Sequence, residues 1–547
     1  MKNKVKGGIV VAPEPLAAKA GKRILEKGGN AFDAAVATAF AQGVVNPLLC
    51  GIGGSSLALV SEAATKEVAV IDASATVGSK RIPKNWDDLY RGRSETVGRF
   101  ILAGEANQVG YQSIMLPGFI KGAFHMFERY GSGKVSWAEV LAPAIEYASE
   151  GFAVYPYIAN FWRNVDGAED RPGYPGLKAK LAISADARRI YGKNGYEAYD
   201  VGEILVQKEM GQTLQRVADE GPDVFYKGDL AKQMAADFEK NGAFITYEDL
   251  RDYSVWESTP TRGTYRDYEV VSVLPPGSGP QMVQMLQIAE HFDLAAMDPN
   301  SDEYIDLLSK IMRIGFMDNV LLKNDPPYSI GEELVERFSS REYAEHCAEL
   351  IRQGKELRGG SASGLGGGTT HLTIADYDGN VVSWTHTTGS IAGSGAITPG
   401  LGFLHNNFLG HFNPLSQCWD SIVPGKRGGG GAPVMILKDG KPVLALGAPG
   451  GSRIMSSVFQ VALNILEHGL PAKEAVSVPR FHSEEDNLIF IEPAFAPEVE
   501  AGLAKRENKV ERSTYMSRVM AVCLEHGAEL KLSGGSDPRG GGGLEIV

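Results

Sequence analysis

Hydrophobic and polar positions follow a helical period through most of the chain and change to a strand period in its C-terminal third. Residues 15–45 are rich in alanine and predict a long helix or a helix pair, with an interruption at Gly28-Gly29-Asn30. Short apolar runs predict strands at 56–60 and 68–71. Helical patterns dominate from about 119 to 355.

A glycine-rich segment separates the two kinds of pattern. Residues 359–368 hold six glycines in ten positions and predict a linker. A phosphate-binding loop is the alternative, but the Lys-Ser/Thr ending is missing and a strand pattern follows. Strand patterns continue to about 449, and a helix is predicted over 452–467. Helices, then strands, then helices suit an α/β protein of the four-layer αββα type, with 72–110 as a polar surface excursion.

A hairpin is predicted directly after the linker. Alternating segments at 369–375 and 381–387 flank Asp378-Gly379, a dipeptide typical of two-residue turns. In that register residue i faces residue 757 − i, so Thr370 is expected opposite Thr387. Thr369 is then one residue away from Thr387 across the two strands.

Thr369 is the candidate nucleophile. It follows Gly368, which places no side chain beside the peptide bond, and the Thr387 hydroxyl is near. Cleavage at Gly368–Thr369 would free an α-amine that can act as the base for the threonine's own hydroxyl, as in self-cleaving N-terminal nucleophile (Ntn) hydrolases. The alternative is a threonine-rich edge hairpin behind a flexible linker, because threonine is simply a good strand residue.

Short motifs in a fixed order run through nearly the whole chain. They are Gly8-Ile9-Val10-Val11-Ala12, Gly28-Gly29-Asn30-Ala31-Phe32-Asp33, Cys50-Gly51-Ile52-Gly53-Gly54, Pro117-Gly118, Val224-Phe225-Tyr226-Lys227-Gly228, Leu274-Pro275-Pro276-Gly277-Ser278-Gly279, Thr369-Thr370-His371, Gly447-Ala448-Pro449-Gly450-Gly451-Ser452-Arg453 and Ser536-Asp537-Pro538-Arg539. With these motifs in this order, the chain resembles the γ-glutamyltranspeptidase family.

The resemblance implies a proenzyme with the αββα Ntn-hydrolase fold. Residues 1–368 would form the large segment and 369–547 the small catalytic segment, together one structural unit after autocleavage. Thr369 matches the family's nucleophile, and Thr387 matches the second threonine that orients it. The Gly450-Gly451 pair matches the backbone donors of the oxyanion hole, for which consecutive glycines are physically suited. A plain turn is the alternative for these glycines.

The positions that recognise substrate in the family carry other residues here. Ser74 stands in place of an arginine, Gly389 in place of an asparagine, Phe408 in place of an amide side chain, His411 in place of an acidic residue, and Gly429 and Gly430 in place of paired serines. Losing such a charge pair costs binding energy, so a γ-glutamyl substrate is expected to bind poorly. We therefore expect an amidohydrolase or acylase that hydrolyses a linear amide of a non-glutamyl acyl group. A genuine γ-glutamyl hydrolase or transferase with a rebuilt pocket, and a non-catalytic binding protein, stay open.

Histidines cluster around the predicted site. They are His371, His386, His405 and His411, and the expected register places His371 opposite His386. A metal site is the alternative to packing, but no cysteine or carboxylate clearly completes one, so no metal and no cofactor are expected. His411 is the one histidine at a specificity position. Trp384 and Phe408 are expected to make the site partly aromatic.

Charge and composition limit the classes of binding partner that are expected. The net charge of −13 and the pI near 5.4 argue against nucleic acid. The four cysteines show no metal-ligand spacing and no disulfide framework, and no apolar stretch is long enough for a membrane span. No signal peptide precedes the first motif, so a cytoplasmic location is expected. The expected partners are a small-molecule amide substrate and the two cleavage fragments themselves, with a homodimer left open.

Overall fold

Two stacked β-sheets form the centre of the computed structural model, which describes residues 7–94, 99–163, 172–322, 332–355, 368–418, 420–428 and 431–547. The seven-stranded sheet contains, in spatial order, β22 (Gly543–Ile546), β1 (Gly8–Ala12), β12 (Gly368–Asp376), β13 (Val381–Gly389), β2 (Ser55–Glu62), β3 (Glu67–Ala73) and β9 (Trp256–Ser258). The six-stranded sheet contains β10 (Thr261–Tyr265), β11 (Tyr268–Ser272), β15 (Val434–Lys438), β16 (Lys441–Gly447), β20 (Met520–Glu525) and β21 (Lys531–Ser536).

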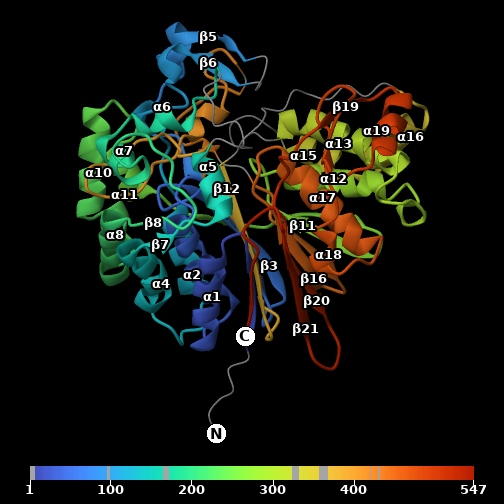
Figure 1. The fold of residues 1–547 in the computed structure, drawn as a ribbon, viewed down its shortest axis with the longest axis horizontal. Coiled ribbons are helices and arrows are strands. Elements are labelled where there is room, and N and C mark those ends of the chain that lie inside the picture. Colours follow the sequence, from blue (N-terminus) through green and yellow to red (C-terminus); the bar gives the residue numbers. More distant parts are fainter. Residues whose placement is uncertain are drawn as a thin grey trace.

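Helices cover the outer face of each sheet, so the molecule has the four-layer αββα architecture that the sequence predicted (Figure 1). On the side of the seven-stranded sheet lie α1 (Pro15–Glu26), α2 (Ala31–Val45), α3 (Phe119–Tyr130), α4 (Trp137–Glu150) and α8 (Lys208–Glu220). On the other side lie α12 (Gly279–Ala289), α13 (Asp302–Leu322), α16 (Arg341–Arg352) and α17 (Arg453–Leu466). Alternating side chains of both sheets, such as Val11 and Val522, form a separate apolar layer between them.

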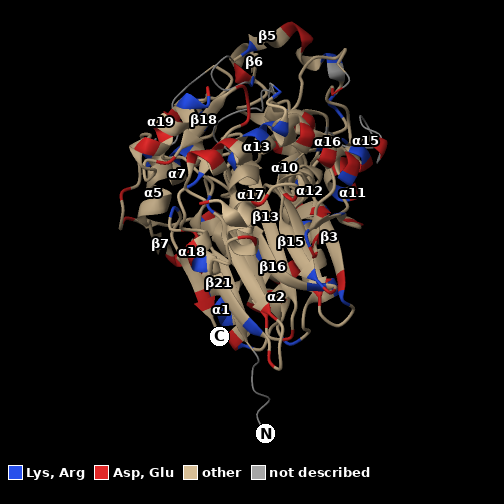
Figure 2. Cartoon of the chain, turned by 90° about the vertical axis from the view of Figure 1, so that its right-hand side faces the viewer, with Lys and Arg blue, Asp and Glu red and all other residues tan. Residues whose placement is uncertain are grey.

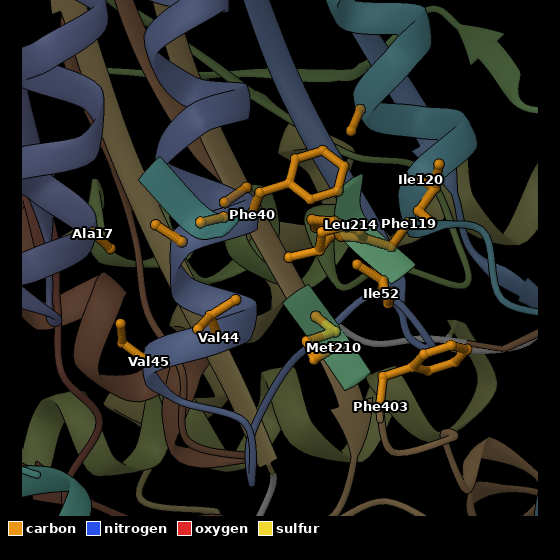
Figure 3. Packing of buried hydrophobic residues seen from close by; sticks show 14 of the residues in the cluster. Ala17, Phe40, Val44, Val45, Ile52, Phe119, Ile120, Met210, Leu214 and Phe403 are labelled. Atoms are coloured by element: carbon orange, nitrogen blue, oxygen red, sulfur yellow. The ribbon is translucent and has the colours of Figure 1, made fainter. Parts of the chain in front are cut away.

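The helix pair predicted over 15–45 is confirmed. Gly28, with a φ of 94°, ends the first helix, and Asn30 caps α2 by accepting from the Phe32 and Asp33 amides at 3.0 Å. Every residue of α2 is buried, because this helix lies between the sheet and further helices. Phe40 of α2 packs edge-on against Phe119 of α3, with ring centroids 5.2 Å apart (Figure 3).

The predicted register of the hairpin is wrong by one residue. The turn is a three-residue loop rather than a two-residue one, with Gly379 at a φ of 95° and Asp376 hydrogen-bonded to Asn380 across it. The Asp376 carboxylate accepts from the amides of Asp378 and Asn380 at 3.0 Å, which stabilises this longer turn. Thr369 therefore lies directly opposite Thr387.

Some of the other predicted elements are confirmed, whereas the strands expected up to about 449 are missing from the described residues between 390 and 433 except for the two-residue strand at Arg427–Gly428. The strands predicted at 56–60 and 68–71 are β2 and β3, and the helix predicted over 452–467 is α17. Strands β9, β10 and β11 lie inside the region predicted to be mainly helical. They are short, and pairing with distant strands stabilises them rather than a strong local pattern. The excursion over 72–110 carries only short elements, among them β5 (Tyr90–Arg93) and β6 (Phe100–Leu102) at one end of the molecule (Figure 1).

No helix among the described residues is both long enough and apolar enough to cross a membrane. Positions of acidic and of basic residues are interspersed along the ribbon in Figure 2. The glycine-rich linker predicted at 359–368 lies outside the described residues except for Gly368.

Candidate active site

Thr369 lies near the start of β12, which is held between β1 and β13. Side chains alternate along a strand, so Thr369 shares the face of Thr373, whose hydroxyl donates to the Met520 carbonyl of the second sheet at 3.0 Å. The predicted nucleophile thus points into the layer between the sheets. It is 6% exposed, and its hydroxyl forms no hydrogen bond within the described part of the chain.

The Thr387 hydroxyl is directed at the peptide bond that the sequence predicts to be cut. It donates to the carbonyl oxygen of Gly368, and it accepts from the Gly389 amide at 2.9 Å. A register shift between Gly368 and Thr369 brings this carbonyl to the threonine. The sequence predicted that Thr387 orients the Thr369 hydroxyl. In the uncleaved chain the Thr387 hydroxyl instead donates its hydrogen bond to the Gly368 carbonyl.

The Gly450-Gly451 loop connects β16 to α17. Its backbone has φ values of 141° and 63°, which only glycine adopts without strain, and neither amide donates a hydrogen bond to any other described residue. Both amides precede the first turn of α17, where the helix dipole favours negative charge. The two glycines can therefore act as donors to a developing oxyanion, which is the role predicted for them.

His371 and Gly447 fix this loop relative to Thr369. A Cβ atom at Gly447 would lie 2.3 Å from His371 Cε1, so β16 passes directly over the imidazole. His371 lies two residues along β12 from Thr369 and on the same face. The ring is bonded to the Thr385 and Thr373 hydroxyls at 2.8 Å and 3.1 Å, and burial lowers its pKa to about 3, which keeps it neutral.

A buried polar network supports the opposite face of β12. The Glu14 carboxylate accepts from Thr370 Oγ1 at 2.9 Å, from Gln42 at 2.6 Å and from Asn46 at 2.7 Å. Gln42 also bonds to His386 at 2.8 Å. Burial raises the pKa of Glu14, with the three hydrogen bonds opposing that shift. The network anchors β12 at Thr370, the residue after Thr369. No motif in the sequence predicted this network.

Ser74 lies beside an ion pair rather than a free cation. Its amide donates to Asp72 Oδ1 at 2.9 Å, and its own hydroxyl has no hydrogen-bond partner among the described residues. Asp72 in turn pairs with Arg427 at 2.5 Å. Arg427 belongs to β14 (Arg427–Gly428), which pairs with β4 (Ala75–Thr76) just after Ser74. The positive charge of Arg427, on the strand that pairs just after Ser74, is thus matched by the Asp72 carboxylate.

The predicted aromatic residues occupy three different environments. Phe408 is fully buried in a small apolar cluster with Met115 and does not face Trp384. Trp384 stacks on Phe119 at 5.8 Å, on the helix side of the sheet, so the expectation that it lies near the site is wrong. His411 is exposed, edge-on to the Phe408 ring at 5.6 Å. Gly429 and Gly430 lie outside the described residues.

Two amide side chains fill the space around the altered positions. A Cβ atom at Gly389 would lie 2.3 Å from Asn407 Oδ1, and one at Gly410 would lie 2.6 Å from the Gln108 side chain. Asn407 Nδ2 donates to Gln108 Oε1 at 3.3 Å and to Ser390 Oγ at 2.7 Å. The space that a larger side chain at 389 would need is therefore occupied by this chain's own polar groups.

The four histidines are dispersed. The corrected register places His371 opposite Thr385, so it faces the second sheet whereas His386 faces the helices. His405 is bonded to Thr398 at 3.0 Å in an aromatic environment. No group of three or more histidine, cysteine or acidic side chains placed to hold a metal ion is found among the described residues.

Comparison with known proteins decides the family. A sequence profile described as Gamma-glutamyltranspeptidase matches residues 17–547. The chain belongs to the γ-glutamyltranspeptidase family. It is 35% identical to the Acylase ACY 1 proenzyme of Pseudomonas sp. (strain V22) over 511 residues, covering 92% of this chain and 88% of that protein. It is 30% identical to the Glutathione hydrolase proenzyme of Escherichia coli (strain K12) over 556 residues, covering 98% and 91%.

Solved structures agree with this assignment. The crystal structure of cephalosporin acylase from Bacillus halodurans superposes with a TM-score of 0.87 at 27% identity, covering 99% of this chain and 96% of that one. The chain is therefore an Ntn hydrolase of the γ-glutamyltranspeptidase family, and its αββα fold is that of the family's acylases.

The sequence indicated which candidate residues lie together better than it indicated their surroundings. Thr369, Thr387 and Gly389 lie together in the structure, as the motifs suggested. Asn407 was visible only as part of an Asn-Asn pair with no assigned role. Gln108 lies in the excursion and carried no sequence signal, because its contact with the site depends on segments that are distant along the chain.

Proposed function

We propose that this protein cleaves itself at Gly368–Thr369 and then hydrolyses amides of a non-glutamyl acyl group through an acyl-enzyme on Thr369. The observation that supports this most directly is the hydrogen bond from Thr387 to the Gly368 carbonyl, beside a Thr369 hydroxyl that bonds to no other residue in the described ranges. A donor on the carbonyl and a free hydroxyl next to it are the two groups that an internal acyl shift requires.

The first reaction is an N-to-O acyl shift. Thr369 Oγ attacks the Gly368 carbonyl carbon, and the Thr387 hydroxyl stabilises the negative charge that develops on the oxygen. The C–N bond then breaks and the nitrogen takes the proton that the hydroxyl loses, which leaves an ester. Water hydrolyses this ester to a Gly368 carboxylate and a free Thr369 with its own α-amine.

The second reaction uses the same hydroxyl on a substrate amide. The new α-amine accepts the Thr369 hydroxyl proton, and the oxygen attacks the substrate carbonyl. The amides of Gly450 and Gly451, which donate to no other residue that the structure describes, are the donors we assign to the resulting oxyanion. The amine leaves with the proton, and water releases the acyl group.

The residues around Ser74 support an acyl group other than γ-glutamyl. Arg427, whose strand pairs just after Ser74, forms an ion pair with Asp72, and the space at Gly389 is filled by Asn407. Neither arrangement leaves the charge pair that a glutamyl α-carboxylate and α-ammonium would require. The two fragments should stay associated, because β1, β2 and β3 share one sheet with β12 and β13.

The test compares Thr369→Val and Thr369→Ser with Thr388→Val. The control removes a hydroxyl that makes no hydrogen bond among the described residues. The wild type, Thr369→Ser and Thr388→Val should give fragments 1–368 and 369–547 on a denaturing gel, the small one beginning at residue 369. Thr369→Val should stay intact and inactive on simple acyl anilides. Amide hydrolysis by intact Thr369→Val contradicts the proposal, and a clear preference for γ-glutamyl anilide restores the glutamyl alternative.

A further inference from the structure

The helix that follows the Gly450-Gly451 loop is hydrogen-bonded to a separate strand close to its first turn. Ser456 of α17 and His482 of β17 (Phe481–His482) are both buried, and Ser456 Oγ lies 2.7 Å from His482 Nδ1. His482 Nε2 lies 3.6 Å from a carboxylate oxygen of Glu484. None of these three side chains takes part in the two proposed reactions.

The order of serine, histidine and carboxylate is that of a hydrolase triad, but this cluster cannot hold a second nucleophile. Ser456 is 0% exposed, so a substrate carbonyl cannot reach its hydroxyl. Burial lowers the pKa of His482, although Glu484 opposes that shift, and the ring is neutral. With its single N–H on Nε2, facing the carboxylate, the ring leaves Nδ1 to accept from the Ser456 hydroxyl. The contacts thus assign one tautomer to the ring and one direction to the hydrogen bond.

Further contacts fix both partners of this hydrogen bond. One turn along α17, Gln460 Nε2 donates to the Phe481 carbonyl at 2.8 Å, and the Phe481 amide donates back to Gln460 Oε1 at 3.2 Å. The His482 ring contacts two aromatic rings, edge-on to Phe316 at 5.5 Å and stacked on Phe490 at 6.2 Å. The imidazole is therefore a fixed point to which the first turns of α17 are attached.

The start of α17 sets the position of the two glycine amides. Ser452, the residue after Gly451, is hydrogen-bonded through its side chain to Glu484, so the same cluster reaches the loop directly. The loop is also closely packed, because a Cβ atom at Gly450 would lie 2.2 Å from Ser517 Oγ. Since the loop joins the helix without a further residue of slack, a displacement of the first turn of α17 would move both amides with it.

Backbone donors stabilise an oxyanion best when they are held in place before it forms. We propose that Ser456 and His482 are positioning residues for amide hydrolysis, because their hydrogen bond fixes the first turns of α17 and with them the two glycine amides. This inference rests on the proposed function, which gives these amides their role. Glu484 keeps the N–H of the imidazole on Nε2, and neither Ser456 nor His482 touches the substrate.

The first test compares Ser456→Ala with Ser457→Ala. Ser457 is the matched control, because it is the next residue of α17, is also fully buried, and its hydroxyl has no hydrogen-bond partner among the described residues. In the self-cleaved protein, Ser456→Ala should lower kcat for a butanoyl anilide roughly 10-fold to 10²-fold with KM unchanged, because misplaced donors act on the transition state. Ser457→Ala should keep the wild-type kcat. Self-cleavage should be unaffected in both variants, because the donor to the Gly368 carbonyl is Thr387.

Variants of His482 separate loss of the hydrogen bond from loss of the side chain. His482→Asn places an amide oxygen close to the position of Nδ1, so it should restore most of the turnover that His482→Leu loses. Adding Ser456→Ala to His482→Leu should lower kcat no further, because both changes remove the same hydrogen bond. Effects that multiply would overturn the proposal, since the two side chains would then act separately.

A boronic acid gives a second readout that needs no turnover. The boron of butylboronic acid bonds to Thr369 Oγ, whose proton passes to the α-amine, and one oxygen of the tetrahedral boronate then occupies the oxyanion position. Its Kd, measured by calorimetry on the self-cleaved protein, should rise in Ser456→Ala by about the same factor as kcat falls.

The outcomes separate this inference from the proposed function. A wild type that binds the boronic acid but hydrolyses no anilide contradicts the proposed function, and weaker binding by Ser456→Ala then still supports the positioning role. Wild-type kcat and Kd in Ser456→Ala overturn the positioning role alone. A raised KM with unchanged kcat, or equal losses in Ser456→Ala and Ser457→Ala, also overturns it, because the hydroxyl would then serve substrate binding or general stability.

Discussion

Replacing Thr387 by valine tests the chemistry of self-cleavage most sharply. Valine has nearly the same shape, so the substitution removes one hydroxyl and little else. That hydroxyl donates to the Gly368 carbonyl oxygen and accepts from the Gly389 amide at 2.9 Å. The first bond is the one that strengthens as negative charge develops on the carbonyl oxygen during the acyl shift.

The expected decrease in the cleavage rate follows from the kind of hydrogen-bond donor that is lost. Removing one preorganised oxyanion donor costs about 2.7–4 kcal/mol in the transition state, so cleavage should slow roughly 10²-fold to 10³-fold. The buried Gly389 amide also loses its partner, which destabilises the folded chain by about 1–3 kcal/mol. The rate effect should therefore be large, while the protein still folds at room temperature.

The assay follows the full-length band on denaturing gels after cell-free synthesis at low temperature. Thr385→Val is the control: it lies on the same strand face two residues away, and its hydroxyl bonds to His371 rather than to the carbonyl. We expect the control to cleave within about 10-fold of the wild type, because no oxyanion donor is removed. Cleavage of Thr387→Val at the wild-type rate would show that the observed hydrogen bond has no part in the reaction.

Two further predictions concern the support of the site. Gly447→Ala places a Cβ atom 2.3 Å from the His371 ring, so we expect the unfolding free energy to fall by about 1–3 kcal/mol and amide hydrolysis to slow. Denaturant unfolding measures the first effect and anilide turnover the second. Unchanged values of both would contradict the close packing of β16 on His371. Burial lowers the pKa of His371, His386 and His405 to about 3, below the unfolded value near 6.5. The unfolded chain thus binds protons that the folded one does not. The stabilising contribution of these neutral histidines is therefore fully present above pH 6.5 and is lost as the pH falls from 6.5 to 3. Each histidine should account for about 2 kcal/mol of loss by pH 5, so a melting temperature constant from pH 7 to 5 would refute this.

The candidate reacting residues could be proposed from sequence because they occupy short contiguous motifs. Thr369 follows the glycine run directly, and Gly450-Gly451 is flanked by a strand pattern and a helix pattern. The register of the hairpin could not be found in the same way. Asp378-Gly379 is compatible with loops of two or three residues, and the Asp376 carboxylate, bonded to two loop amides, selected the longer one.

The specificity side of the site depends on residues that local patterns do not connect. The sequence showed that the family's arginine was absent at Ser74, but not that Arg427 would be held nearby by Asp72. It gave no indication that Lys180, on a helix of five residues, would reach Ser390. Such contacts form only when the excursion and the helical region fold back onto the hairpin.

By itself, the sequence determined the family, the αββα layers and the identity of the candidate nucleophile, because these are encoded in local periodicity and in short motifs that follow a fixed order. Tertiary structure decided that the Thr387 hydroxyl donates to the carbonyl of Gly368, and that the buried Lys180 binds Ser390 and Ile391. These depend on loop length, on strand register and on burial. The loop length, and with it the register, follows from the contacts of Asp376 with its own turn. The burial of Lys180 against Ser390 instead arises from segments 210 residues apart, which no local pattern connects.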